Sequence, residues 1–90
     1  MTHTEPAILL SRHAQTRMQQ RAIRMDGIDL LFRFGECRYA GHGAESYYFT
    51  RQSWRQVEAH LGTQIGAYER YRNIYVIVAN GVVVTTAYRH

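Results

Sequence analysis

The sequence contains no lysine. Arginine supplies all eleven of the Lys and Arg side chains. A guanidinium offers a planar fork of donors that matches two phosphate oxygens at once, and it stacks on flat rings. With a net charge of +4 and seven tyrosines interleaved with the arginines, the composition favours RNA as the first partner to consider. A GC-rich genome also favours arginine codons whatever a protein does. The placement of the arginines therefore has to distinguish between the two explanations.

Cysteine, long apolar runs and the common cofactor motifs are also scarce. Cys37 is the single cysteine, so the chain forms no internal disulfide. No run of about 18 apolar residues and no leader-like opening is present, and we expect a cytoplasmic protein with no membrane partner. The sequence has no glycine-rich phosphate loop, no cysteine pair and no HExxH motif. We therefore expect neither a cofactor nor a metal ion.

The first half of the chain has the periodicity of two helices. Ser11 stands where an N-cap is expected, and a helix over residues 11–22 is predicted by one apolar stripe, Ala14, Met18, Ala22 and Met25. A shorter helix that ends before Gly35 is indicated by three apolar residues, Ile28, Leu31 and Phe32. Residues 1–10 have no clear period and are interpreted as a loose terminus or an edge strand.

The second half of the chain predicts two hairpins with a helix between them. The stretch "ECRYAGHGAESYYFT" contains two short strand candidates around Gly41, His42 and Gly43. From Arg51 onward the apolar spacing is helical, with a break near Gly62 and Thr63. In "NIYVIVANGVVVTTAYRH", Asn80-Gly81 predicts a type I′ turn.

That turn also predicts the strand register, with Ala79 opposite Val82 and Tyr75 opposite Thr86. One face of the hairpin would then carry Tyr75, Thr86 and Tyr88 together. Residues 1–90 are expected to form a single α+β domain: an N-terminal helix pair packed on an antiparallel sheet of about four strands, with a further helix before the C-terminal hairpin.

Three basic residues on the first predicted helix form the first candidate site. His13, Arg17 and Arg21 are four residues apart, so they line one stripe that spans roughly 12 Å of helix axis. The stripe runs beside the buried residues, at the border where the helix meets the sheet. An exposed basic face, or pairing with Glu36 and Glu45, would explain the same pattern. Arg24 is placed in the turn before the second helix and is left out of the site.

The end of the last strand supplies the second group, Tyr88 and Arg89, because a strand end in a small sheet is accessible to a ligand. His90 is given little weight since it is the last residue. Tyr48 and Tyr75 are candidates for stacking RNA bases, or they are half-buried sheet residues. Cys37, beside Arg38, is interpreted as a small hydrophobic residue rather than as an activated thiol.

A histidine, several arginines and a tyrosine are the groups that a metal-independent ribonuclease uses. Attack by the 2′-hydroxyl of RNA needs a base, cations on the phosphate and an acid for the leaving 5′-oxygen. We assign His13 as base or acid, Arg17, Arg21 and Arg89 to the phosphate, and Tyr88 as proton donor or phosphate ligand. For this assignment to hold, His13, Arg17, Tyr88 and Arg89 must converge.

The segments "SRHAQTRMQQRAI", "HGAESYYF" and "IYVIVANGVVVTTAYR" resemble a domain-of-unknown-function family of small bacterial and phage proteins. That family is related to the BrnT and RelE ribonuclease toxins of the barnase and colicin superfold. The resemblance covers residues 11–89 and implies an RNA-cleaving, toxin-like role with an antitoxin protein as partner. His13, Arg17 and Arg21 match the helix motif of the family, and Tyr88 and Arg89 match its final-strand pair.

The sequence departs from the family pattern at two positions. Ala22 stands where glycine is common, and Arg24 stands where serine or threonine caps the second helix. The first departure is expected to lengthen the first helix, and the second to weaken the start of the next one.

Two other classes of function remain open beside the ribonuclease. The first is a non-catalytic RNA- or protein-binding module on the same fold. The second is an interaction protein that binds a protein partner, or a second copy of itself in a homodimer, on an open sheet face with Tyr75, Ile77 and Val84.

Overall fold

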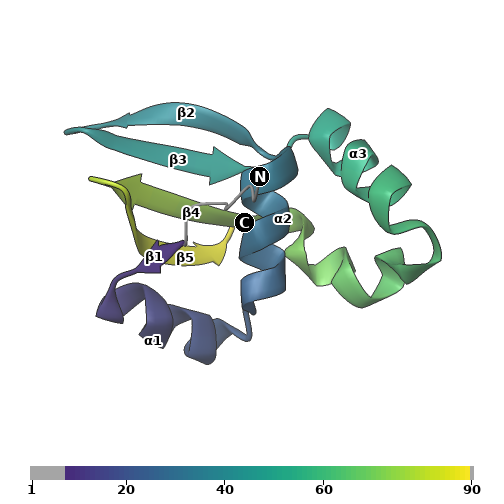
Figure 1. Cartoon of the computed structure of the whole chain (residues 1–90), viewed down its shortest axis with the longest axis horizontal. Helices are drawn as coiled ribbons and strands as arrows, with labels where there is room; N and C mark the ends of the chain where they lie inside the picture. The colour runs from purple at the N-terminus through teal and green to yellow at the C-terminus, as the bar shows by residue number, and fades with distance from the viewer. Residues whose placement is uncertain (1–7, 90) are drawn as a thin grey trace, which may run out of the picture.

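Five strands form one sheet in the order β1-β5-β4-β3-β2, and the helices pack beside and across it (Figure 1). The structure is a computed structural model that describes residues 8–89. Its elements are β1 (Leu9–Leu10), α1 (Arg12–Arg21), α2 (Met25–Phe34), β2 (Glu36–Gly41), β3 (Ala44–Tyr48), α3 (Arg51–Leu61), the 3-10 helix η1 (Gly62–Asn73), β4 (Ile74–Ala79) and β5 (Val82–Tyr88).

The predicted α+β architecture is confirmed, with a helix pair before the sheet and a further helix before the Asn-Gly hairpin. Two details differ from the prediction. The sheet has five strands rather than about four, and it is mixed, because β1 pairs parallel to β5. A strand of two residues is too short to show an alternating pattern, which is why only the edge-strand interpretation of residues 1–10 allowed for it. Residues 1–7 lie outside the described part of the chain.

Local hydrogen bonds explain where α1 begins and ends. The Ser11 Oγ accepts from the Ala14 backbone N at 3.0 Å, as an N-cap does, and it also donates to the Val84 carbonyl at 3.2 Å. Ala22 follows the helix in the left-handed region, with φ 54°. The expectation that Ala22 lengthens the helix is therefore wrong. Arg24 is the N-cap residue of α2 and makes no side-chain capping bond, which agrees with the expected weak start.

The long C-terminal helical pattern divides into two kinds of helix. α3 begins at a capping box of Thr50 and Ser53 and ends at Leu61, close to the predicted break. Gly62 has φ 57°, and the chain continues as the 3-10 helix η1 rather than as a second α-helix. Figure 1 shows α3 and η1 on the right, beyond the strands.

The core lies between the helices α1, α2, α3 and η1 and one face of the sheet. Trp54 packs edge-to-face on Phe49, with ring centroids 4.9 Å apart, and the Tyr71 ring lies against α2. The remaining buried apolar residues of the core come from every layer: Ala14, Ile23, Ile28, Leu30, Leu31, Val57, Ile74, Val76 and Val83.

The C-terminal hairpin has the predicted turn but not the predicted register along its whole length. Asn80 and Gly81 have φ of 53° and 76°, and Ala79 pairs with Val82 as expected. A β-bulge then adds one residue to β5, so that Tyr75 pairs with Ala87 and not with Thr86.

The bulge moves the end of β5 by one residue and exchanges its faces. Thr86 pairs with the buried Val76 and is itself fully buried, and its Oγ1 donates to the Tyr75 carbonyl at 2.9 Å. The predicted face that joined Tyr75, Thr86 and Tyr88 is therefore wrong. Because opposed residues share a face, Tyr75 lies with Ala87 on the face away from the core, which we name the outer face.

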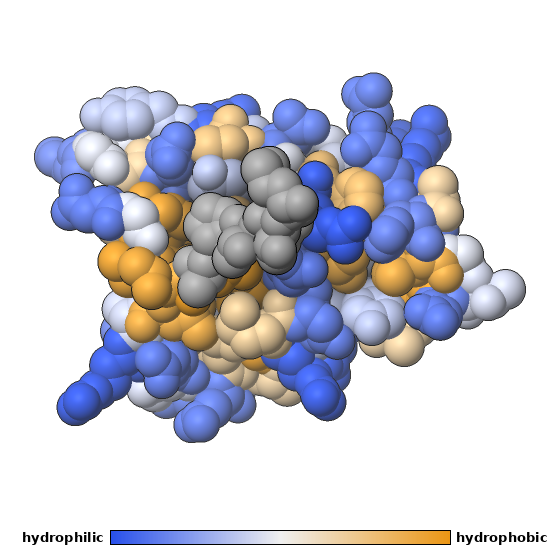
Figure 2. All heavy atoms as spheres, viewed as in Figure 1, coloured by the Kyte–Doolittle hydropathy of each residue, from blue (hydrophilic) through white to orange (hydrophobic). Residues whose placement is uncertain are grey.

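The hydropathy of the surface differs between the region of β1, β4 and β5 and the region of α1 (Figure 2). Figure 2 shows hydrophobic side chains (orange) over the region of β1, β4 and β5, and mostly hydrophilic ones (blue) over α1. Leu9 is 58% exposed and contributes to the apolar region. In the described residues, no helix is long and apolar enough to span a membrane.

Candidate nucleic-acid interface

One end of the sheet carries a pocket that brings together residues far apart in the sequence. It encloses about 570 Å³, and its walls are Arg21, Tyr75, Ala87, Tyr88 and Arg89. Arg21 is the last residue of α1, and Tyr75 lies near the start of β4. Ala87 and Tyr88 end β5, and Arg89 follows directly after it. The arrangement follows from the packing of α1 along β5, which starts at the Ser11 bonds to Val83 and Val84. Four of the predicted site residues therefore meet here.

The Arg21 guanidinium has one nitrogen, Nη1, that is buried without a hydrogen-bond partner among the described residues. A buried donor without a partner destabilises a protein by about 1–3 kcal/mol, and more when the group is charged. Arg21 also lines the pocket, so a small rotation of its side chain would let this nitrogen donate to an anion held there.

Arg89 is held in place by contacts on three sides. Its backbone N donates to the Asn73 carbonyl at 2.6 Å, and its Nη2 donates to the Phe49 carbonyl at 3.1 Å. The guanidinium carbon lies 5.2 Å from the centroid of the Tyr48 ring, within cation–π range. A guanidinium ordered in this way loses little conformational entropy when it binds an anion.

Tyr48 lies between two arginines on the outer face. The Arg38 guanidinium carbon is 5.6 Å from the ring centroid, on the neighbouring strand β2. Together Arg21, Tyr75, Arg89, Tyr48 and Arg38 cross the sheet from α1 to β2, and we name them the arginine–tyrosine strip. The sequence prediction missed Arg38. Its pairing with Ser46, two residues before Tyr48, is the pattern that would have placed it on the same face.

His13 and Arg17 form a separate pair on α1. The Arg17 Nε donates to His13 Nε2 at 3.3 Å, and Arg17 Nη1 donates to the Gln20 side chain at 3.0 Å. His13 is exposed and lies eight residues before Arg21, roughly 12 Å along the helix axis. The structure thus divides the predicted stripe, with Arg21 in the pocket and the His13–Arg17 pair outside it.

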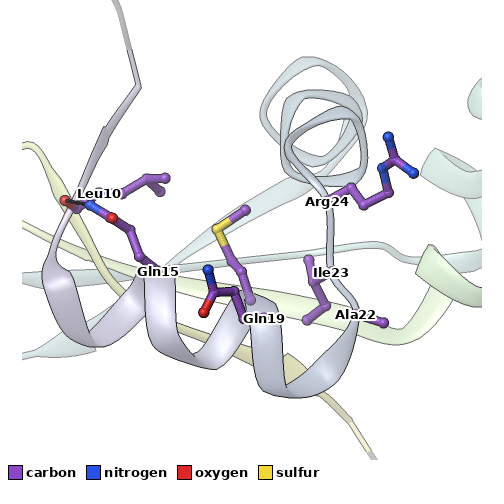
Figure 3. Close-up of a pocket in the computed structure, with 7 residues that line it drawn as sticks. Leu10, Gln15, Gln19, Ala22, Ile23 and Arg24 are labelled. Atoms are coloured by element: carbon purple, nitrogen blue, oxygen red, sulfur yellow. Dashed lines mark hydrogen bonds between the residues drawn. The ribbon is translucent and has the colours of Figure 1, made fainter.

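A second hollow, of about 410 Å³, lies on another side of α1 (Figure 3). Leu10 stands at one end and Arg24 at the other, with Gln15 and Gln19 projecting from the helix between them. The Gln15 Nε2 donates to the Leu10 carbonyl at 3.4 Å. Met18, Ala22 and Ile23 complete the lining, and none of the predicted site residues contributes to it.

Cys37 has the environment of an unactivated thiol. It is exposed at the edge of the sheet, and its Sγ donates to the Glu45 carboxylate at 3.4 Å. Local burial raises the pKa of the Cys37 thiol, and the bond to Glu45 and its charge raise that pKa further, against an opposing bond from Tyr47. Within residues 8–89, no three His, Cys, Asp or Glu side chains are grouped so that they can hold a metal ion.

No protein-family model matches the chain, and neither a curated protein nor a solved structure is significantly similar to it.

Proposed function

We propose that this protein binds single-stranded RNA along the arginine–tyrosine strip, with a phosphate group in the pocket of Arg21 and Arg89. The observation that supports the proposal most is the buried Nη1 of Arg21, which has no partner among the described residues. Two arginines in one pocket of about 570 Å³ suit a doubly liganded phosphate. A cytoplasmic location belongs with this proposal, because RNA is found there.

The aromatic members of the strip give the proposed site its preference for nucleic acid over simple anions. Tyr48 and Tyr75 lie on the outer face next to the arginines, and both are half-buried and therefore well ordered. Bases of single-stranded RNA stack on such rings without regard to sequence, which contributes about 1–3 kcal/mol per base. We expect little sequence preference and a strong dependence on salt.

Fluorescence anisotropy with a labelled single-stranded RNA tests this function. For single strands, the logarithm of the association constant falls with the logarithm of salt concentration by about 0.7 for each neutralised phosphate. Arg21→Ala is expected to weaken binding and to reduce this slope by about 0.7. Arg55→Ala is the matched control, because Arg55 is exposed on α3, away from the strip, and its removal changes the net charge equally.

Equal effects of Arg21→Ala and Arg55→Ala would show that binding depends only on net charge, and the proposed interface would then be wrong. A wild type that binds no RNA at low salt would reject the function itself.

Metal-independent RNA cleavage is the second candidate, because Tyr88 is one of the residues that line the same pocket. Two arginines would stabilise the crowded phosphate. The 2′-hydroxyl would lose its proton to solvent water as it attacks, and the Tyr88 phenol would give its proton to the leaving 5′-oxygen. His13, the predicted base, lies roughly 12 Å along α1 from Arg21, which is why we place binding before cleavage.

Cleavage is tested on a denaturing gel in the presence of a chelator. If the protein is a ribonuclease, it cuts RNA but not the same oligonucleotide with 2′-deoxy sugars, and Tyr88→Phe cuts more slowly while binding unchanged. Slowed growth on over-expression, relieved by a co-expressed antitoxin, would extend the result to a toxin-like role. If the wild-type protein leaves the RNA intact, the ribonuclease function is rejected and the RNA-binding function remains.

A further inference from the structure

The strand β2 leaves one edge of the sheet open. Every residue from Glu36 to Ala40 is exposed, and among residues 8–89 Figure 1 shows no helix or strand above β2. The opposite edge of the sheet is covered, because β1 pairs with β5 there and α1 lies along β5 (Figure 1). An uncovered edge strand presents unpaired N–H and C=O groups that can accept another strand.

The regular part of β2 is short and limits how a second strand can pair. A register irregularity between Tyr39 and Gly41 leaves Ala40 without an opposite residue on β3, so regular pairing extends only from Glu36 to Tyr39. When two copies of one strand pair antiparallel about a two-fold axis, one residue lies opposite its own copy. The choice of that residue fixes every other pair.

Charge selects among the possible registers. A centre at Arg38 or at Glu36 would place like charges directly opposite each other, which is destabilising. A centre at Cys37 instead places Glu36 of each copy opposite Arg38 of the other, giving two pairs of opposite charge. These side chains point to the outer face, because Glu36 pairs with Tyr48 and Arg38 with Ser46 on β3.

We propose that two copies of this chain associate through their β2 strands, antiparallel and centred on Cys37, to form one continuous sheet. The Arg38 side chains then lie near the join, so the two arginine–tyrosine strips become a single longer surface. The inference depends on β2 alone and holds whether or not the strip binds RNA.

Sedimentation equilibrium over a concentration series, at low and high salt, measures the association. Arg38→Glu and Glu36→Arg each turn both attractive pairs into repulsive ones, and each is expected to raise the dissociation constant of the dimer by roughly tenfold or more. The double variant with both substitutions restores opposite charges across the join and is expected to dimerise like the wild type. This recovery separates a lost interface from a misfolded monomer.

A disulfide between the two Cys37 residues reports the register. The Cα atoms of directly opposed residues in an antiparallel pair are about 4.5–5.5 Å apart, within the range that a disulfide spans. Added oxidised glutathione takes up two electrons and two protons from the two thiols, and a covalent dimer is expected on a non-reducing gel. In the control Cys37→Ser with Tyr39→Cys, the new thiols are four residues out of register, about 13 Å, and no rapid cross-link is expected.

A wild type that stays monomeric throughout the concentration series would overturn the proposal. A double charge-swap variant that remains as weak as the single variants would also overturn it. If the Tyr39→Cys control cross-links faster than the wild type, the register centred on Cys37 is wrong.

Discussion

Ala22 occupies a backbone conformation that suits glycine better than alanine. Its φ of 54° and ψ of 40° lie in the left-handed region, and its side chain is exposed. This conformation costs an L-residue about 1–2 kcal/mol, a cost that glycine avoids. We expect Ala22→Gly to raise the free energy of unfolding by about 1 kcal/mol in urea denaturation. In contrast, Ala59→Gly, at an exposed position inside α3, should lower it by about the same amount.

Gly27 is required by a close approach rather than by its backbone angles. A Cβ on this residue would lie 2.8 Å from the ring of Tyr71, whose hydroxyl accepts from Arg24 N at 3.3 Å and from Arg70 Nη2 at 2.7 Å. The ring is thus fixed, and Gly27→Ala should lower the free energy of unfolding by roughly 1–3 kcal/mol.

Gly66→Ala is the control for this substitution, measured by the same denaturation. A Cβ there meets nothing within 4 Å, so the change should stay within about 0.5 kcal/mol. Equal losses at the two positions would show that steric conflict with Tyr71 is not the cause.

At the scale of the element, the two side-chain N-caps differ in how far their contacts reach. Thr50 and Ser53 bond only each other's backbone and side chains at the start of α3, whereas Ser11 caps α1 and also donates to Val84 on β5. Thr50→Ala should cost about 1 kcal/mol, and Ser11→Ala about 2 kcal/mol because a tertiary bond is lost as well. Equal costs in thermal or urea unfolding would contradict a role of Ser11 in docking α1 on the sheet.

Elements with a local chemical cause were predictable from the sequence, and those with a tertiary cause were not. Ser11 caps α1 and Asn80-Gly81 forms the turn, because each depends on neighbouring backbone groups. The bulge in β5 has no compositional mark, yet one extra residue was enough to exchange the faces of Thr86 and Tyr88. The spacing of three residues from Ile65 through Tyr68 to Tyr71 fits a 3-10 helix as well as an α-helix, so the sequence did not distinguish the two for η1.

The same division applies to the candidate site across the whole molecule. Tyr88 and Arg89 were predicted at an accessible strand end, and Arg21 on the border of the first helix, and the structure places all three around one pocket. Helical spacing put His13 on the same side of α1 as Arg21. However, residues on one side of a helix can be far apart along its axis, and about two turns separate His13 from Arg21. Arg38 was missed because only the sheet order brings β2 into line with β5.

Strand β5 joins the N-terminal elements β1 and α1 to the rest of the sheet. β5 pairs with β1 on one side and β4 on the other, and α1 packs along it. A chain that stops after Gly81 should therefore show no cooperative unfolding transition by circular dichroism. Adding a peptide of residues 82–90 should restore part of the transition. A cooperative transition in the shortened chain would show that α1 and β4 have another partner.

The late position of β5 in the sequence also affects how the domain is made. β1 and α1 are synthesised early, whereas β5, against which they pack, follows every other element of the domain. A nascent chain grows at about 5–20 residues per second, so the apolar side of α1 stays uncovered for seconds before its partner leaves the ribosome. Chaperones that hold nascent chains have that interval in which to bind Leu10, Ala14 and Ile23, and the native domain forms only after synthesis has passed β5.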